Sequence, residues 1–210
     1  LIRSFTDKEL VAIVEDLSVD DAVDIIGEMP ANVVARILRS ADAQTRKSIN
    51  EILLYPEDSA GSMMTPEYVA LRPNMTVEEA FDKIRKVGHD KETIYTCYVT
   101  QSDRTLVGVV TAMDLMLAEP DTLISELMET NVIYTTTDED KENVVIKFSD
   151  YGFLALPVVD KGNRLVGIVT VDDAMDVIEE ENTEDIAKMA AMAPTDKPYL
   201  KTSPLSLWKN

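Results

Sequence analysis

The chain contains the same pattern twice, as LVGVVTAMDLM over residues 106–116 and as LVGIVTVDDAM over residues 165–175. In each copy an apolar run leads through Gly to Thr and Asp, which is typical of a strand that ends where a helix begins. The Thr hydroxyl can cap that helix, and the Asp three residues later can bind a ribose hydroxyl or a cation. The repetition indicates a duplicated structural unit.

The duplication extends toward the N-terminus, because residues 64–80 align with residues 128–144. Each segment begins with Met, continues into a short apolar strand and reaches an acidic helix start. The offset between the copies falls from 64 to 59 residues, so the first copy holds five extra residues, which we place in a loop at 88–92. Each copy therefore predicts the order strand, helix, strand, strand, helix. The first and second strands are predicted at residues 68–71 and 93–99 in the first copy, and at 132–134 and 154–159 in the second.

Helical patterns flank the duplication on both sides. Residues 1–62 predict four short helices in the manner of a helical repeat, with Ser18 capping the second helix and Pro30 starting the third. A further helical pattern follows the second copy and ends at Pro194. The predicted fold class is α+β: a helical-repeat segment, a tandem strand-and-helix module and a long connecting helix.

Composition excludes several classes of function. The 210 residues carry 39 Asp and Glu against 20 Lys and Arg, a formal charge of −19 that disfavours nucleic acid and favours cations. A single cysteine and a single histidine argue against disulfides, thiolate metal cages and a Ser-His-Asp triad. We expect no enzyme, since nothing supplies a nucleophile or an oxyanion cradle for a hydrolase that would use paired carboxylates.

Acidic side chains form two base-free stripes. Asp20, Asp24 and Glu28 follow one another at helical spacing, and a second stripe includes Asp173, Asp176, Glu180 and Glu184. Like charges at this spacing cost a helix a few tenths of a kcal/mol per pair. Solvated acidic faces and helix capping account for many such stripes, but carboxylates with water are also the ligands that Mg²⁺ prefers. Two stripes on separate segments favour a Mg²⁺ site.

The duplicated unit resembles a tandem pair of CBS domains, a Bateman module. This resemblance implies a regulatory dimer that senses a ligand, with adenine nucleotides such as ATP as frequent ligands. A homodimer would cover the apolar positions Leu115, Met116, Met175 and Ile178 of the predicted helices. The nucleotide contacts implied are Thr111, Asp114, Thr170 and Asp173. Met113 stands where a basic residue could have met phosphate, and the alternative is that Thr and Asp only cap their helices.

Over nearly its whole length the chain resembles the cytosolic part of the MgtE magnesium transporters. The resemblance rests on the order of segments, on YPEDSAGSMMTPEYV at residues 55–69 and on EENTEDI at residues 180–186. It implies residues 1–62 as part of the N domain, 63–124 and 125–177 as CBS domains, 178–203 as the plug helix and 204–210 as the start of a membrane-proximal segment. Gly152 stands where the family can have an acid. The sensing carboxylates implied are Asp20, Asp24, Asp140, Glu142, Asp173, Asp176, Glu181, Glu184 and Asp185.

The resemblance implies a function at the cytoplasmic side of the cell membrane. Mg²⁺ would bridge the acidic faces of the N domain, the CBS dimer and the plug helix, and so close a transmembrane pore that follows this segment in the chain. The alternative is a free-standing CBS sensor of adenine nucleotides that regulates an attached enzyme. That alternative predicts stabilisation by nucleotide, little effect of Mg²⁺, and no membrane sequence after Asn210.

Overall fold

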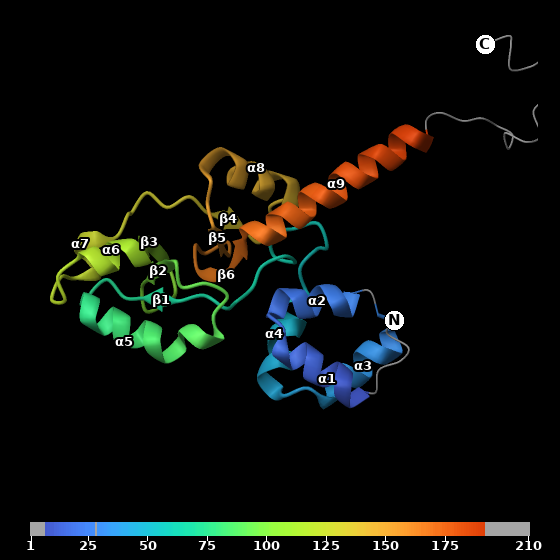
Figure 1. The fold of residues 1–210 in the computed structure, drawn as a ribbon, viewed down its shortest axis with the longest axis horizontal. Helices are drawn as coiled ribbons and strands as arrows, with labels where there is room; N and C mark the ends of the chain where they lie inside the picture. The colour runs from blue at the N-terminus through green and yellow to red at the C-terminus, as the bar shows by residue number, and fades with distance from the viewer. Residues whose placement is uncertain (1–6, 28, 192–210) are drawn as a thin grey trace, which may run out of the picture.

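The structure is a computed structural model that describes residues 7–27 and 29–191, with the side chains of residues 9–27 and 29–183. A bundle of short helices precedes two similar strand-and-helix units, and a long helix projects from the second unit (Figure 1). The predicted α+β architecture is therefore confirmed. None of the helices between residues 7 and 191 combines the length and the apolar character needed to cross a bilayer.

The N-terminal bundle has the predicted short helices around one apolar core. Pro30 precedes the third helix, and Asp42 caps the fourth by accepting hydrogen bonds from the backbone N–H groups of Gln44 and Thr45. Val14, Ile26, Ile37 and Ile49 are almost fully buried in the core, which lets helices this short remain folded. The helices are α1 (Asp7–Asp16), α2 (Val19–Gly27), α3 (Ala31–Ser40) and α4 (Ala43–Ile52).

The two copies of the duplicated unit have the predicted order of elements. The first copy contains β1 (Ala70–Leu71), α5 (Val77–Val87), β2 (Thr96–Thr100), β3 (Leu106–Thr111) and α6 (Ala112–Leu117). The second contains β4 (Thr135–Thr136), α8 (Lys141–Tyr151), β5 (Ala155–Val159), β6 (Leu165–Thr170) and α9 (Val171–Ala191). The first copy also has a short 3-10 helix, η2 (Gly88–Asp90), where the extra residues were predicted, and α7 (Ile124–Leu127) precedes the second copy.

Each copy forms a three-stranded sheet with its second strand in the middle. β1 runs parallel to β2, and β3 runs antiparallel to it with Tyr98 opposite Val109. The second sheet repeats this arrangement, with Leu156 opposite Val169. The middle strand β5 is buried at every position, which explains its continuous apolar sequence. A shared core that includes Tyr98 and Ile168 joins the two sheets.

The two copies exchange the segments that lead into them. Thr65, before the first copy, pairs with Ile168 of β6, and Glu129, before the second, pairs with Val109 of β3. The motif glycine makes this close approach possible. A Cβ atom on Gly167 would lie 2.7 Å from the Met64 sulfur and 2.9 Å from the Thr65 carbonyl oxygen, and Gly108 has the same relation to Met128 and Glu129. The repeated Met and the repeated Gly are therefore partners across the copies.

Three details differ from the sequence-based expectations. The first strand of the second copy lies at Thr135–Thr136, just after residues 132–134. Leu115 is fully buried within its own copy, so it offers no apolar surface to a partner. The predicted division between residues 177 and 178 falls inside the continuous helix α9, which the structure describes as far as Ala191. The rest of the predicted plug segment and the predicted segment 204–210 lie outside the described residues.

Candidate functional site

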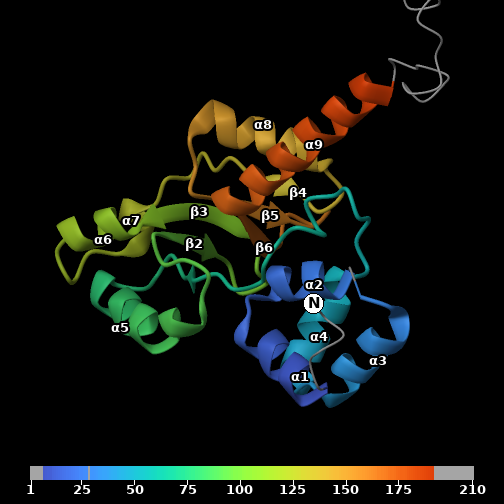
Figure 2. The ribbon, with the colours of Figure 1, turned by 45° about the vertical axis from the view of Figure 1, so that its right-hand side comes forward.

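Carboxylates from three parts of the chain meet where the helical bundle approaches the second copy. In Figures 1 and 2, α2 is the bundle helix that lies toward the sheets and the start of α9. We call this region the acidic interface. Its carboxylates belong to α2, to two loops of the first copy and to α9: Asp20, Asp24, Glu67, Glu92, Asp172, Asp173, Asp176 and Glu180.

Asp20 is the most buried carboxylate of the acidic interface. The residue is 5% exposed, and its Oδ1 atom is buried without a hydrogen-bond partner. Burial raises the pKa of Asp20, although a hydrogen bond from Ser18 opposes the shift. A buried carboxylate oxygen without a partner is costly, so this atom is a position that a cation or a proton would stabilise.

The start of α9 places its carboxylates against Asp20. Asp173 closes the N-terminal turn of α9, because its Oδ2 accepts hydrogen bonds from the backbone N–H and the hydroxyl of Thr170. Burial and the nearby Asp20 carboxylate raise the pKa of Asp173 to about 7 despite those hydrogen bonds. Burial also raises the pKa of Asp24, with further contributions from Asp20 and from Glu180 and Asp176 of α9.

Two glutamates of the first copy complete the acidic interface, although neither of them is predicted from the sequence as a site residue. Burial raises the pKa of Glu67 to about 7, and the Asp20 and Glu92 carboxylates add to that shift. The backbone N–H of Glu92 donates to the carbonyl oxygen of Glu67 at 2.9 Å, which holds the two residues together. Glu92 ends the five-residue insertion of the first copy, so the broken repeat offset was a signal that could have drawn attention to it.

The structure separates the predicted metal residues into groups. Asp20 and Asp24 approach Asp173 and Asp176, whereas Glu142 and Glu181 line a groove between α8 and α9. Asp140 caps α8 and accepts a hydrogen bond from the Glu142 backbone N–H at 2.9 Å. Glu184 and Asp185 have side chains outside the described residues.

No preformed metal cage exists among the described residues. Within that part of the chain, no three carboxylate, histidine or cysteine side chains are positioned to hold one ion together. Gly152, where the family can carry an acid, is instead the left-handed C-cap of α8 with φ of 66°.

A separate cavity of about 530 Å³ lies between the two copies, within the size range of small-molecule sites. Its wall is mainly apolar and aromatic, with Thr96, Thr111, Glu129 and Asn131 as polar groups. None of the described residues that line it is basic. Of the four predicted nucleotide contacts, Thr111 lines this cavity. Asp114 forms a capping box with Thr111, while Thr170 and Asp173 form the corresponding pair at the acidic interface.

Comparison with known proteins places these features in a family. The model of the MgtE intracellular N domain matches residues 1–58, and the CBS domain model matches residues 60–121 and 124–180. The magnesium transporter MgtE of Thermus thermophilus is 45% identical over 195 residues, which cover 91% of this chain. The chain spans 43% of the length of that relative.

Two solved structures agree with this result. The cytosolic domain of the Mg²⁺ channel MgtE in complex with ATP is 43% identical with a TM-score of 0.80, over 84% of this chain and 72% of that one. The soluble part of a magnesium transporter is 34% identical with a TM-score of 0.82, over 84% and 69% of the two chains.

Proposed function

This chain belongs to the MgtE family of magnesium transporters, as a part of their cytosolic region, and we propose that it senses Mg²⁺ and gates a transmembrane pore. Mg²⁺ bridges α2 and α9 at the acidic interface and favours a compact assembly. That assembly holds α9 in the position that closes the pore. The pore belongs to a membrane domain that follows this segment in the whole protein, and the segment lies on the cytoplasmic side of the cell membrane.

One observation carries the proposal: the Asp20 carboxylate, whose Oδ1 is buried without a hydrogen-bond partner, lies near enough to Asp173 of α9 for its charge to raise the pKa of Asp173. Without a cation, like charges on the two elements repel one another in a poorly solvated setting. A hydrated divalent ion replaces that repulsion with shared coordination. Asp20, Asp24, Asp173 and Asp176 would hold the ion, and Glu67, Glu92 and Glu180 would add negative potential. The test is stabilisation by Mg²⁺ that is lost when Asp173 and Asp176 are replaced together by Asn.

The proposed role is regulatory and not enzymatic. The Thermus relative, whose match covers most of this chain, is a transporter. This favours a role as part of a transporter over a role as a free-standing sensor that regulates an attached enzyme. The net charge of −19 supports a cation as the ligand and disfavours nucleic acid as a partner. Carboxylate oxygens supply the hard donor atoms that Mg²⁺ requires.

A second function is supported by the cavity between the copies: binding of an adenine nucleoside. The relative crystallised with ATP shows that this fold accepts an adenine nucleotide in one member of the family. In this chain the cavity offers an apolar wall for a base, with the side chains of Thr96 and Asn131 as polar groups. Met113 is 62% exposed at its edge, and the Glu129 carboxylate opposes a phosphate group. We infer that the cavity favours the nucleoside over its phosphates.

Calorimetry with adenosine and ATP tests this specificity. We expect adenosine to bind at least as tightly as ATP, and Met113→Arg to improve ATP relative to adenosine by about tenfold, because one charge-assisted contact to phosphate is worth about 1.4 kcal/mol. Leu54→Arg is the matched control, since Leu54 is 84% exposed and does not line the cavity. A parent chain that binds ATP tenfold more tightly than adenosine would contradict the inference.

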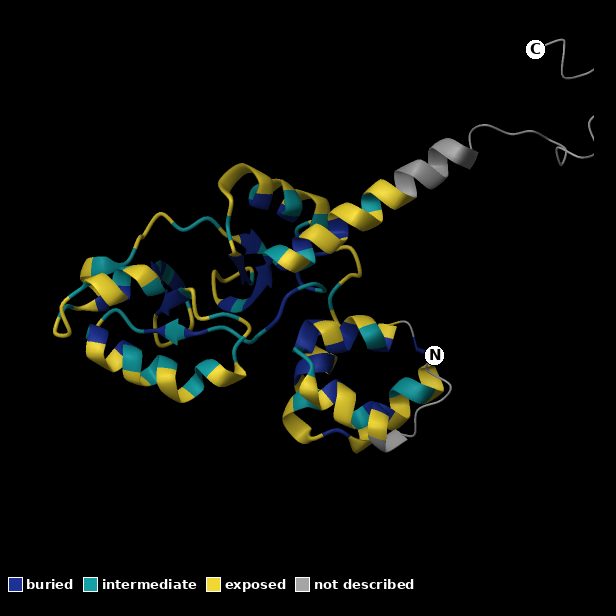
Figure 3. Cartoon of the chain, in the orientation of Figure 1, coloured by how far each residue is buried: buried dark blue, intermediate teal, exposed yellow. Residues whose placement is uncertain are grey.

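We also propose that two copies of the chain associate through α6 and the first turns of α9. Met116 and Leu117 are 67% and 81% exposed, and Met175 is 60% exposed. Figure 3 shows exposed stretches, in yellow, on the helices of the first copy and along α9. Sedimentation at tens of micromolar should find a dimer, which Met116→Asp with Met175→Asp converts into monomer because burying two charges is costly. Leu54→Asp, at an 84% exposed position of the bundle, should leave the dimer intact. A parent chain that sediments only as monomer would refute the proposal.

A further inference from the structure

The linker between the helical bundle and the first copy, residues 55–62, runs along the second copy. Its backbone N–H groups at Ala60 and Gly61 donate to the carbonyl oxygens of Glu139 and Thr137 at 2.7 and 3.0 Å. In return the backbone N–H of Lys141 donates to the Asp58 carbonyl oxygen at 3.0 Å. The linker is thus attached to the start of α8, far along the chain.

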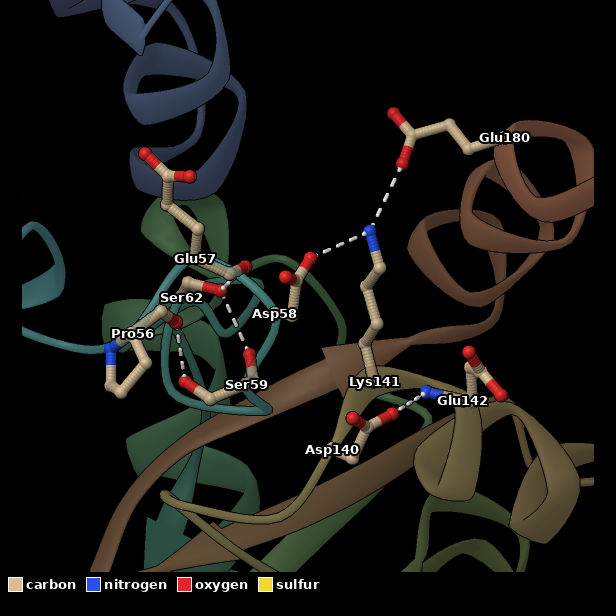
Figure 4. A network of polar contacts seen from close by, with 9 residues as sticks. All are labelled: Pro56, Glu57, Asp58, Ser59, Ser62, Asp140, Lys141, Glu142 and Glu180. Carbon is tan, nitrogen blue, oxygen red and sulfur yellow. Dashed lines mark hydrogen bonds and ion pairs between the residues drawn. The ribbon is translucent and has the colours of Figure 1, made fainter. Parts of the chain in front are cut away.

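Lys141 stands between this linker and α9 (Figure 4). Its Nζ atom lies 3.1 Å from Asp58 Oδ1 and 3.5 Å from Glu180 Oε2. The Lys141 side chain is only 20% exposed, whereas the side chains of Asp58 and Glu180 are 75% and 70% exposed. One partly buried ammonium group therefore contacts a carboxylate from each of two segments that are separated by more than a hundred residues.

Both segments that Lys141 contacts are locally stiff. The linker is folded on itself by side-chain hydrogen bonds: the Ser59 hydroxyl donates to the Pro56 carbonyl oxygen at 2.7 Å, and the Ser62 hydroxyl donates to that of Ser59 at 2.8 Å. On the other side, Glu180 belongs to the continuous 21-residue helix α9. A displacement of either segment moves its carboxylate relative to the Lys141 ammonium, so the two ion pairs connect the positions of the segments.

We propose that Lys141 is a resident cation that couples the linker to α9 in the metal-free protein. It is a positioning residue. Its two ion pairs fix the position of the linker at the end of the helical bundle relative to α9 before any Mg²⁺ binds. The proposal goes beyond Mg²⁺ sensing, because it concerns a cation that the chain itself supplies. It is tested without metal, so its outcome is independent of whether Mg²⁺ binds at the acidic interface.

Hydrogen exchange of the Ala60 and Gly61 amides, followed in a buffer with chelator, measures how often the linker detaches from the second copy. Glu180→Gln weakens a contact on α9, yet we expect it to speed exchange of these linker amides by about threefold, the effect of losing one partly exposed ion pair. Lys141→Met should speed exchange at the linker and also in α9 around Glu180. In the Lys141→Met background, Glu180→Gln should cause no further change at the linker.

Two variants distinguish coupling from local damage. Lys141→Arg keeps the charge and should retain the exchange rates of the parent at both segments. Lys161→Met removes a lysine from the exposed pair with Asp138, 3.7 Å away, and should leave both segments unchanged. The proposal is wrong if Glu180→Gln leaves the linker amides at the parent rate, or if Lys161→Met speeds their exchange as much as Lys141→Met does. Should Lys141→Met fail to fold, the Glu180→Gln result decides.

Discussion

In millimolar Mg²⁺ the melting temperature of this chain is expected to rise by about 5–10 °C above its value in Na⁺ at equal ionic strength. An ion that binds only the folded state at a hundredfold excess over Kd adds about 2.7 kcal/mol, and each kcal/mol moves the melting temperature of a chain this size by about 2–4 °C. The Na⁺ control removes generic screening, so the difference reports shared coordination at the acidic interface. Calorimetric melting curves provide the measurement.

Replacing Asp173 and Asp176 together by Asn tests whether these two carboxylates bind the ion. Without Mg²⁺ the double variant should melt at a higher temperature than the parent, because repulsion against Asp20 and Asp24 falls. Its response to Mg²⁺ should shrink to less than about half that of the parent. The matched control is Glu119→Gln with Asp121→Asn, which removes two exposed carboxylates from a turn of the first copy. A double Asn variant that responds as fully as the parent would exclude these carboxylates as the site.

The same melting curves should depend on pH in a defined direction. Asp173 and Glu67 have folded-state pKa values raised to about 7 from ordinary values of 3.8 and 4.5, so the folded chain binds their protons more tightly than the unfolded chain. This contribution to stability is complete at pH below about 4 and is lost as the pH rises through about 7. In chelator we therefore expect the melting temperature to fall between pH 5 and pH 8. The rise in melting temperature that Mg²⁺ causes should become larger over the same pH range, since the ion competes with protons for these carboxylates.

The second large effect is expected from Gly61→Ala in the linker. An added Cβ atom would lie 2.5 Å from Cγ of Tyr55 and 2.8 Å from the Thr137 carbonyl oxygen, to which the Gly61 backbone N–H donates. Because the backbone oxygen cannot move away without breaking this attachment, we expect a loss of about 1–3 kcal/mol in the free energy of unfolding. Denaturant titration measures it.

Gly27→Ala is the matched control for this substitution. Gly27 lies at the end of α2, and an added Cβ atom there would meet nothing within 4 Å. We expect its effect to be neutral or slightly stabilising, because Ala has less freedom than Gly in the unfolded chain. Equal destabilisation by both substitutions would show that the close approach at Gly61 does not limit stability.

The spacing of apolar residues predicted the architecture, because strands and helices follow from such local sequence patterns. The repeated strands and helices follow directly from runs such as residues 106–111 and 165–170, and the capping pairs follow from Thr and Asp at fixed spacing. The first strand of the second copy was harder to place, since it spans two residues and its register is set by pairing with β5. Leu115 was misjudged because burial on one helix face depends on what packs against it.

The acidic interface could be predicted only in part. Asp20 and Asp173 stood out as members of base-free stripes, and the structure brings them together. Glu67 and Glu92 did not, because their sequence surroundings include bases and turn residues, and their proximity arises only when the loops of the first copy meet α2. Lys141 was hidden for the same reason, since both of its carboxylate partners are distant in sequence.

The exchange of lead segments between the two copies has a consequence for the independence of each repeat. The segment that fits against Gly167 begins at Met64, and the segment that fits against Gly108 begins at Met128, so each repeat is completed by its neighbour. A lone repeat is half of a folding unit, with an open sheet edge where the missing segment belongs. A chain with only one repeat would need a second molecule to supply that segment, whereas the duplicated chain supplies it within one molecule.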